Sequence, residues 1–446
     1  MLHDEPPFRR VPRPVTGAEP APAATSPATV EPSGLRVPAR RAIEALRAGV
    51  PNHDAVRALG GGQPAIETRF RTVLEAAADD IERGTQTPGL LLAGDFGSGK
   101  SHVLVALEQL ALRENYVCST VAVSKELPLH DADKLYRAAI RAARLPDRRG
   151  NALSELAFKL DWNSLPVEEF STWAASPASG ISSRFPASLL VFQRTHDEEI
   201  RDRIISFWGG DPLSMKDLRG WLRDQGEAGT FPLEHVPMAE LPVQHFAFTS
   251  RIIAAAGYAG WVLLVDELEL ISQYSSKARA RAYASLARWS GRIKEQRCPG
   301  LVSLFTITQD FATLVLHARN DIERIPDRLR ASGREADRQL SVGAEAGMRM
   351  IERDRLALKP PDAETLDRLR EQLREIHGAA YDWQPPELAA GERATSTSMR
   401  QYVRRWINEW DLLRLYPEYQ PSTVSEGLIF DLEEDADMEH QDTDDR

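Results

Sequence analysis

The sequence predicts an α/β fold with a parallel sheet, and three observations support this prediction. Four short segments are apolar throughout and are bounded by breakers or charged residues: 89–93, 116–123, 261–265 and 301–308. Such runs are typical of buried parallel strands, because helices cover both faces of a parallel sheet. Segments with helical periodicity lie between the runs, as parallel connections require. A glycine-rich segment follows the first run directly.

The glycine-rich segment, Gly94–Ser101, reads GDFGSGKS and fits the phosphate-loop pattern G-x-x-x-x-G-K-[ST]. It stands between the first predicted strand and an amphipathic helix, which is the context that the pattern requires. We expect its backbone N–H groups to wrap phosphates, Lys100 to reach the β- and γ-phosphates of ATP, and the Ser101 hydroxyl to bind Mg²⁺. The predicted ATP-binding residues are Gly94, Asp95, Phe96, Gly97, Ser98, Gly99, Lys100 and Ser101.

Two acidic residues, Asp266 and Glu267, follow the apolar run Val262–Val265. After a phosphate loop, this arrangement predicts that Asp266 holds Mg²⁺, through water, and that Glu267 polarises the attacking water as a general base. A glutamate directly after the aspartate favours hydrolysis over nucleotide binding alone. The sequence therefore predicts an ATP hydrolase.

The fourth predicted strand ends in Thr306, Thr308 and Gln309. A polar side chain at this strand tip can reach between the two acidic residues and the γ-phosphate, and Thr308 is our candidate. The alternative is that all three are ordinary polar residues at a strand end.

The segment DIERIPDRLR contains Arg324, Arg328 and Arg330. An arginine at this place can contact the ATP of a neighbouring subunit, where it would stabilise charge in the transition state, a contribution of about 10³–10⁵ in rate in known cases. Arg328 is the candidate. The alternative is a set of exposed arginines in a charged loop.

A helical insertion is expected between the two main motifs, because Lys100 and Asp266 are 166 residues apart, more than a minimal core of this kind needs. We place it at about 147–235. Just before it, the segment Lys134–Arg149 carries arginines that would share one helical face. This face would contact DNA or an acidic partner protein, or would simply be a solvated surface. Its residues are Arg137, Arg141, Arg144 and Arg148.

The C-terminal part has two helical segments, Ala363–His377 and Thr395–Leu415, with Arg400 near the start of the second. A small helical lid that folds over the nucleotide would bring this arginine to the γ-phosphate. The alternative is an arginine in the capping region that pairs with an acid. The C-terminal segments thus predict a lid over the ATP site.

The domain organisation follows from these motifs. We predict a disordered leader at 1–37, an ATPase core with its insertion at 38–358, a helical lid at 359–423 and an acidic disordered tail at 424–446. Residues 431–446 hold nine acids and one arginine, so they carry −8 of the net charge of −11. Amphipathic helices are expected at 39–49 and 65–77.

Composition excludes several classes of protein. Cys118 and Cys298 lie far apart and have no metal-ligand neighbours, which argues against a disulfide framework or a zinc site. The longest uncharged stretch, Ile252–Val265, has 14 residues, whereas a membrane span needs about 20. We therefore expect a soluble, cytoplasmic protein.

The order of phosphate loop, acidic pair, polar strand tip, arginine loop and lid arginine resembles the AAA+ class of P-loop ATPases, nearest to its origin-recognition and loader branch. Several phrases resemble the BREX phage-defence ATP-binding proteins of the BrxD kind. The similarity covers about residues 39–415, interrupted by the variable middle. The phrases are RRAIEALRAGVPN, the phosphate loop, VSKELPLHDADKLYRAAIRAA, AGYAGWVLLVDELEL and SMRQYVRRWINEWD.

This resemblance implies an oligomeric ATPase that works beside other proteins of a bacterial defence system. Loaders of that branch usually end in a winged-helix DNA-binding domain, but only about 30 residues follow the last lid helix here. DNA contact would therefore fall to the insertion or to the arginines at 137–148. Two functions stay open: an oligomeric ATPase that binds or remodels DNA or a DNA-associated complex, and an ATP-dependent switch that acts on protein partners without DNA.

Overall fold

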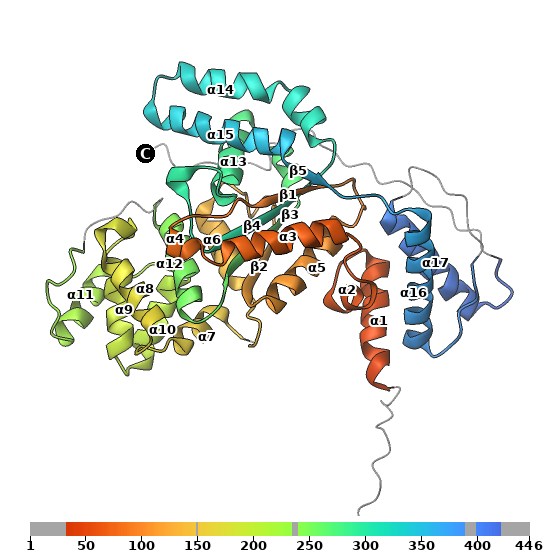
Figure 1. The fold of residues 1–446 in the computed structure, drawn as a ribbon, viewed down its shortest axis with the longest axis horizontal. Helices are drawn as coiled ribbons and strands as arrows, with labels where there is room; N and C mark the ends of the chain where they lie inside the picture. Colours follow the sequence, from red (N-terminus) through yellow and green to blue (C-terminus); the bar gives the residue numbers. More distant parts are fainter. Residues whose placement is uncertain (1–32, 149, 234–239, 389–397, 421–446) are drawn as a thin grey trace, which may run out of the picture.

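A five-stranded parallel sheet lies at the centre of the protein, with strand order β2-β3-β4-β1-β5 (Figure 1). The computed structural model describes residues 33–148, 150–233, 240–388 and 398–420. The predicted parallel α/β sheet and its four apolar strands are confirmed. The strands are β1 Leu90–Ala93, β2 Tyr116–Ala122, β3 Gly260–Asp266, β4 Leu301–Ile307 and β5 Arg355–Ala357. The fifth, β5, is an edge strand of three residues that the sequence pattern did not reveal.

The strands are apolar on both faces because helices cover both faces. Alternate side chains of β1 point to opposite sides, so Leu90 and Leu92 join one core cluster while Leu91 and Ala93 join the other. The first cluster includes α3 (Pro64–Ala77) and α5 (Lys100–Arg113). The second includes four further helices, which are α6 (Ala132–Arg141), α12 (Leu241–Ala255), α13 (Ser276–Trp289) and α15 (Glu335–Arg353). The short helix α4 (Asp80–Arg83) precedes β1.

The predicted insertion is helical and forms a bundle beside one edge of the sheet, on the left of Figure 1. Its core is aromatic: the rings of Phe185, Phe207 and Trp208 lie close to Phe248 or His245 of α12, with centroids 4.9 to 5.4 Å apart. These contacts attach the bundle to α12, which packs on the sheet. Its helices are α7 (Ala152–Lys159), α8 (Leu165–Ala175), α9 (Arg184–Arg194), α10 (Glu198–Trp208) and α11 (Met215–Asp224).

A second helical layer stands at the top of Figure 1, where α14 (Asp321–Ala331) lies beside α15, and α15 packs on α13. The approach of α15 to α13 is close. A Cβ added to Gly347 would lie 2.0 Å from the backbone oxygen of Tyr283, and one added to Gly343 would lie 2.9 Å from the Cβ of Ala284. Only glycine fits at position 347.

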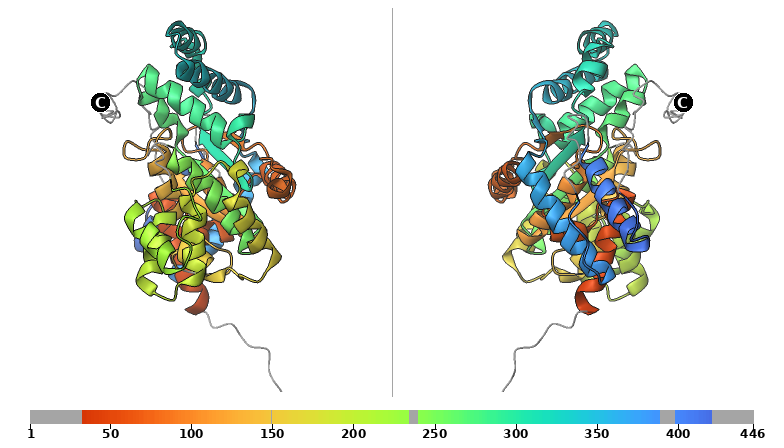
Figure 2. Two further views of the ribbon diagram at one scale, coloured as in Figure 1. Left: turned by 90° about the vertical axis from the view of Figure 1, so that its left-hand side faces the viewer. Right: turned by 90° about the vertical axis from the view of Figure 1, so that its right-hand side faces the viewer.

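Two C-terminal helices are present as predicted: α16 (Ala363–Tyr381) and α17 (Met399–Leu415). They share an apolar cluster with α1 (Ser33–Ala48), in which Ile43, Leu373 and Trp410 are fully buried. The right-hand view of Figure 2 shows α1 beside both helices. The first helix, predicted as part of the ATPase core, thus packs with the lid. A short helix, α2 (His53–Leu59), then leads the chain to the core.

The ends of the chain lie mostly outside the described residues. Of the predicted leader, residues 1–32 are not described, and α1 begins at Ser33, within it. The predicted acidic tail lies in 421–446, also outside the described part. None of the described helices is long and apolar enough to cross a membrane.

Candidate functional site

The phosphate loop leaves the carboxyl end of β1 and enters α5. Gly97 and Gly99 have φ of +78° and +99°, a conformation that side chains with a Cβ rarely adopt. Gly99 is the N-cap of α5 and offers no side-chain cap, so the first N–H groups of the helix stay available to a ligand. The loop and the helix N-terminus together form an anion-binding geometry.

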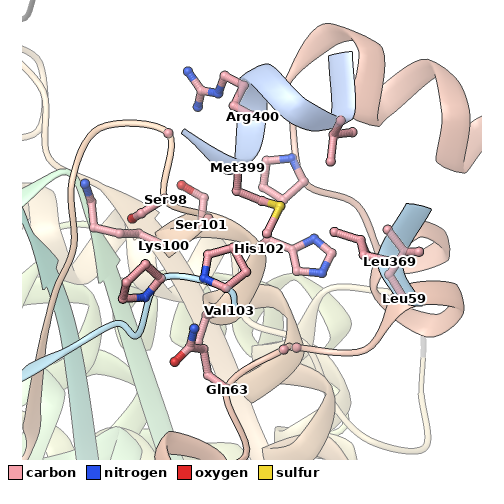
Figure 3. A pocket seen from close by; sticks show the side chains of 18 of the residues that line it. Leu59, Gln63, Ser98, Lys100, Ser101, His102, Val103, Leu369, Met399 and Arg400 are labelled. Atoms are coloured by element: carbon pink, nitrogen blue, oxygen red, sulfur yellow. The ribbon is translucent and has the colours of Figure 1, made fainter. Parts of the chain in front are cut away.

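A cavity of about 430 Å³ opens over this loop, between the core and the lid (Figure 3). One end holds the polar side chains of Ser98, Lys100 and Ser101, and the other end holds Leu59 and Leu369, among others. The cavity therefore has a polar and an apolar half. Its walls come from the loop and the start of α5, the end of β3, the ends of α1 and α2 with the residues that follow them, the segment 359–362 and the N-terminal turns of α16 and α17.

Lys100 is buried, with 7% of its surface exposed. Its Nζ donates a hydrogen bond to the backbone oxygen of Gly94, 3.0 Å away, and lies 3.4 Å from a carboxylate oxygen of Glu269. The ammonium group is thus held at the cavity wall by its own loop and by an acid from the segment that follows β3.

Asp266 and Glu267 reach the same cavity from the end of β3. The hydroxyl of Thr306 donates to the Asp266 carboxylate, and that carboxylate also accepts the N–H of Glu267 at 3.0 Å. Glu267 has φ of +61°, a left-handed conformation that is uncommon outside glycine and that often marks a functional turn. Burial raises the pKa of the Glu267 carboxyl, and the charge of Asp266 adds to this; Lys100 and Arg400 oppose it. A raised pKa suits a proton acceptor.

Of the polar residues at the tip of β4, Thr306 contacts the acidic pair. The register of β3 and β4 explains this contact. Val265 lies opposite Phe305, so the next residues along the two strands, Asp266 and Thr306, are neighbours. The candidate Thr308 is 7% exposed, its hydroxyl has no partner among the described residues, and it does not line the cavity. Its role stays a prediction.

Arg400 lies in the first turn of α17, above the phosphate loop. A capping box of Ser398 and Gln401 starts this helix, and the N–H of Arg400 donates to the backbone oxygen of Gly97 at 3.1 Å. Its guanidinium lies over the ring of Phe96, 5.1 Å from the centroid. Burial and Arg404 lower the pKa of Arg400, and Glu267 opposes them. Arg400 therefore lies at the cavity, close enough to Glu267 for the two charges to interact.

Comparison with known proteins then gives the family. A family model described as "BREX system ATP-binding protein BrxC/D" matches residues 37–159 and 242–426, more than half of the chain. The chain belongs to this family. It is a phage-defence ATP-binding protein, as the sequence resemblance implied. No curated protein and no solved structure matches the chain.

The matched residues include every wall of the cavity and leave out residues 160–241, which hold α8 to α11. The part of the chain that the family model matches therefore holds the sheet, the phosphate loop and the helices α16 and α17, and most of the helical insertion lies outside it.

Two contacts of this BrxC/D site were missed by the sequence analysis. Glu269, which holds Lys100, is the third acid in the run 266–269, and that run was the only signal for it. The side-chain amide of Gln63 accepts from the N–H of Lys359 at 3.1 Å and donates to its backbone oxygen at 2.9 Å. Gln63 thus joins the segment before α3 to the segment 359–362, a long-range pairing that no local pattern indicates.

The prediction of one arginine-bearing helical face is wrong. Helix α6 ends at Arg141, and a β-bridge then pairs the backbone of Arg144 with that of Cys118 in β2, with N···O distances of 2.8 and 3.0 Å. The residues after Arg141 therefore leave the helix, and Arg144 and Arg148 do not continue the helical face of Arg137 and Arg141.

Three of these four arginines also pair with acids. Arg137 contacts Asp133 and Asp211, at 2.8 and 2.6 Å. Arg148 contacts Glu155 at 2.8 Å, and Arg144 lies 3.7 Å from Glu108. Much of the positive charge expected at this surface is therefore compensated within the protein.

The arginines of α14 lie away from the cavity of their own chain. Arg324, Arg328 and Arg330 do not line it, and α14 stands in the upper layer of Figure 1. Arg330 pairs with Glu345 of α15, whereas Arg328 is exposed. A contact of Arg328 with the ATP of a neighbouring subunit stays a prediction.

Proposed function

We propose that this protein is a Mg²⁺-dependent ATPase of a BREX-type defence system and that ATP binds in the cavity between the phosphate loop and the lid. One observation carries the proposal. A single cavity brings Lys100, Ser101, Asp266, Glu267 and Arg400 together from three parts of the chain that are far apart in sequence. Family membership supports ATP binding, and the acidic pair supports hydrolysis.

The size and polarity of the cavity fit a nucleotide. Its volume of about 430 Å³ lies within the usual range for small-molecule sites, roughly 300–1,000 Å³. The apolar half accepts the base, and the loop accepts the phosphates. The buried hydroxyl of Ser98, at the polar half, has no hydrogen-bond partner among the described residues. Unpartnered buried polar atoms are costly, so they favour a polar ligand at this end.

Mg²⁺ would be held by the Ser101 hydroxyl and by Asp266. Within the described residues there is no group of three His, Cys, Asp or Glu side chains that could hold a metal ion. Mg²⁺ needs no such group, because it usually takes one or two protein ligands beside substrate phosphates and waters. When bound, the ion neutralises charge on the phosphates.

Glu267 is proposed as the general base that accepts a proton from the attacking water. Arg400, at the first turn of the lid, is proposed to contact the γ-phosphate. Thr306, which contacts Asp266, and Thr308, which follows β4, are the two candidates for the polar residue at the strand tip. The substrate is thus enclosed by groups from both the core and the lid.

The strand order supports placement in the AAA+ class. Strand β4 lies between β1, which carries the phosphate loop, and β3, which carries the acidic pair, and a helical lid follows β5. On this placement the protein forms homo-oligomers in the cytoplasm, and Arg328 acts on the ATP of the next subunit.

We infer that the ATPase acts on DNA or a DNA-associated complex together with other defence proteins. The alternative is a nucleotide-dependent switch that acts on protein partners without DNA, and the ion pairs of Arg137, Arg144 and Arg148 favour it. ATP turnover measured with and without single- and double-stranded DNA separates the two: stimulation by DNA supports the first and its absence the second.

Two variants test the ATPase proposal itself. Lys100→Ala should abolish ATP binding in calorimetry, because it removes charge-assisted contacts to two phosphates. Glu267→Gln keeps the shape of the side chain but cannot accept the proton, so it should bind ATP normally and lose about 10²–10⁴ in turnover. Undiminished turnover in folded Glu267→Gln protein would place the base elsewhere.

A further inference from the structure

Glu269 is a buried acid in the wall of the proposed ATP site. It lies in the short 3₁₀ segment Leu268–Gln273, directly after β3 and the acidic pair, and 4% of its surface is exposed. One carboxylate oxygen is 3.4 Å from Lys100 Nζ, and the other has no hydrogen-bond partner among the described residues. Burial raises the pKa of this carboxyl, and the Lys100 ammonium partly opposes the effect.

Lys100 and Glu269 together present little net charge to the cavity. Lys100 is itself 7% exposed, and its contacts are this carboxylate and the backbone oxygen of Gly94. Phosphates that enter the loop are attracted by the ammonium and repelled by the carboxylate beside it. In a poorly hydrated site such interactions are stronger than in water.

The pair also stabilises the site before nucleotide enters. A buried ammonium with no counter-ion is costly, and Glu269 removes that cost. Any stabilisation of the empty site is subtracted from the affinity for the ligand, because binding must disturb the Lys100–Glu269 pair.

We propose that Glu269 is the resting counter-ion of Lys100 and that it weakens nucleotide binding so that ADP leaves the site. The inference rests on the proposed ATPase function and adds a positioning residue to it. Glu269 takes no part in the chemical step. It recaptures Lys100 as the diphosphate departs, which speeds product release and readies the site for the next ATP.

The test is ADP binding to full-length protein with Glu269→Gln. Glutamine has the same size and can still accept a hydrogen bond from Lys100, but it carries no charge. We expect the Kd for ADP, measured by calorimetry, to fall about tenfold or more, since a charge next to the phosphates has been removed. The dissociation rate of a fluorescent ADP analogue, measured in a chase with unlabelled ADP, should fall by a similar factor.

Glu108→Gln is the matched control. Glu108 lies on α5, is also 4% exposed and also faces basic groups, with Arg144 at 3.7 Å and His53 at 3.4 Å. It does not line the cavity. This variant should disturb the fold as much as Glu269→Gln but leave the ADP affinity and dissociation rate unchanged. A general loosening of α5 would instead change both variants alike and would overturn the inference.

The outcomes separate the inference from the function on which it rests. If the unmodified protein binds neither ATP nor ADP, the ATPase proposal itself fails. If it binds ADP and folded Glu269→Gln binds ADP equally or more weakly, only the role of Glu269 is refuted. If Glu269→Gln does not fold, Glu269→Met is tested instead, because methionine fills a similar volume without charge. The same decrease in the Kd for ADP is expected of this variant. An unchanged or higher Kd for ADP contradicts the proposal.

Discussion

The contact between Arg400 and Phe96 predicts opposite effects on ATP affinity when either partner is changed. The guanidinium lies over the Phe96 ring, and both residues line the cavity. If Arg400 serves the γ-phosphate, it must leave the ring when ATP binds. Arg400→Ala should then weaken ATP binding, whereas Phe96→Leu should strengthen it, because the resting contact no longer competes. ADP affinity should change little in either variant.

The magnitudes follow from the two contacts that are exchanged. A hydrogen bond to a charged group contributes about 1.5–3 kcal/mol, and a cation–π contact at a partly exposed site about 0.5–1 kcal/mol. Subtracting the lost cation–π contact from the new hydrogen bond leaves a net contribution of Arg400 to the free energy of ATP binding of about 1–2 kcal/mol. Arg400→Ala should therefore raise the Kd for ATP about 5- to 30-fold, and Phe96→Leu should lower it about 2- to 5-fold.

The assay is calorimetry with ATP and ADP on each variant, with Glu267→Gln as background so that ATP is not consumed. Arg404→Ala is the control for damage to the lid. Arg404 lies one turn further along α17, donates to the backbone oxygens of Arg47 and Ala48 at 3.0 and 2.8 Å, and does not line the cavity. Equal loss of ATP and ADP affinity in Arg400→Ala would refute the γ-phosphate role, since the effect would then be general to the lid.

Three further predictions concern stability and DNA. Gly347→Ala should lower the free energy of unfolding by about 1–3 kcal/mol in denaturant titrations, without changing the Kd for ATP, because its Cβ would overlap the Tyr283 oxygen. Asp321→Asn should cost about 3–5 kcal/mol, because it removes the negative charge of a buried ion pair in which Asp321 accepts from Arg279 at 2.7 and 2.9 Å. Exposed Asp327→Asn should cost almost nothing. If DNA binds at Arg137 and Arg141, changing both to glutamate should flatten the salt dependence of log Kd by about two, with ATP affinity kept; an unchanged slope would move the contact elsewhere.

The parts of the fold that could be predicted are those with a local cause. The four longer strands carry apolar residues on both faces, and the phosphate loop follows β1 with Gly97 and Gly99 at positions of positive φ. By contrast, β5 has three residues, Arg355–Ala357, and owes its place to pairing with β1. A three-residue edge strand with partly exposed side chains leaves no periodic signal.

The errors at the arginine segment and the omissions at the site have a common physical reason. Nothing between Arg141 and Pro146 breaks a helix, so periodicity favoured a longer helix, but pairing of Arg144 with Cys118 ends it. Glu269 likewise becomes significant only because Lys100, 169 positions earlier, lies against it. Such features depend on contacts between segments that are distant in sequence, and spacing alone does not encode them.

On the proposed function, ATP in the cavity would contact both the core and the lid, so its presence should affect the position of the lid. Contacts between the predicted core and lid include the pairing of Gln63 with Lys359 and the bond from the N–H of Arg400 to the Gly97 oxygen. A ligand that touches both the core and the lid binds one arrangement of the two better than the others and shifts the protein toward that arrangement. Because α1 packs with α16 and α17, it would move with them if the lid moves. The insertion and α14 pack with the core instead. If the lid moves when nucleotide is exchanged, a partner bound to the insertion or to α14 would change position relative to a partner bound to α1.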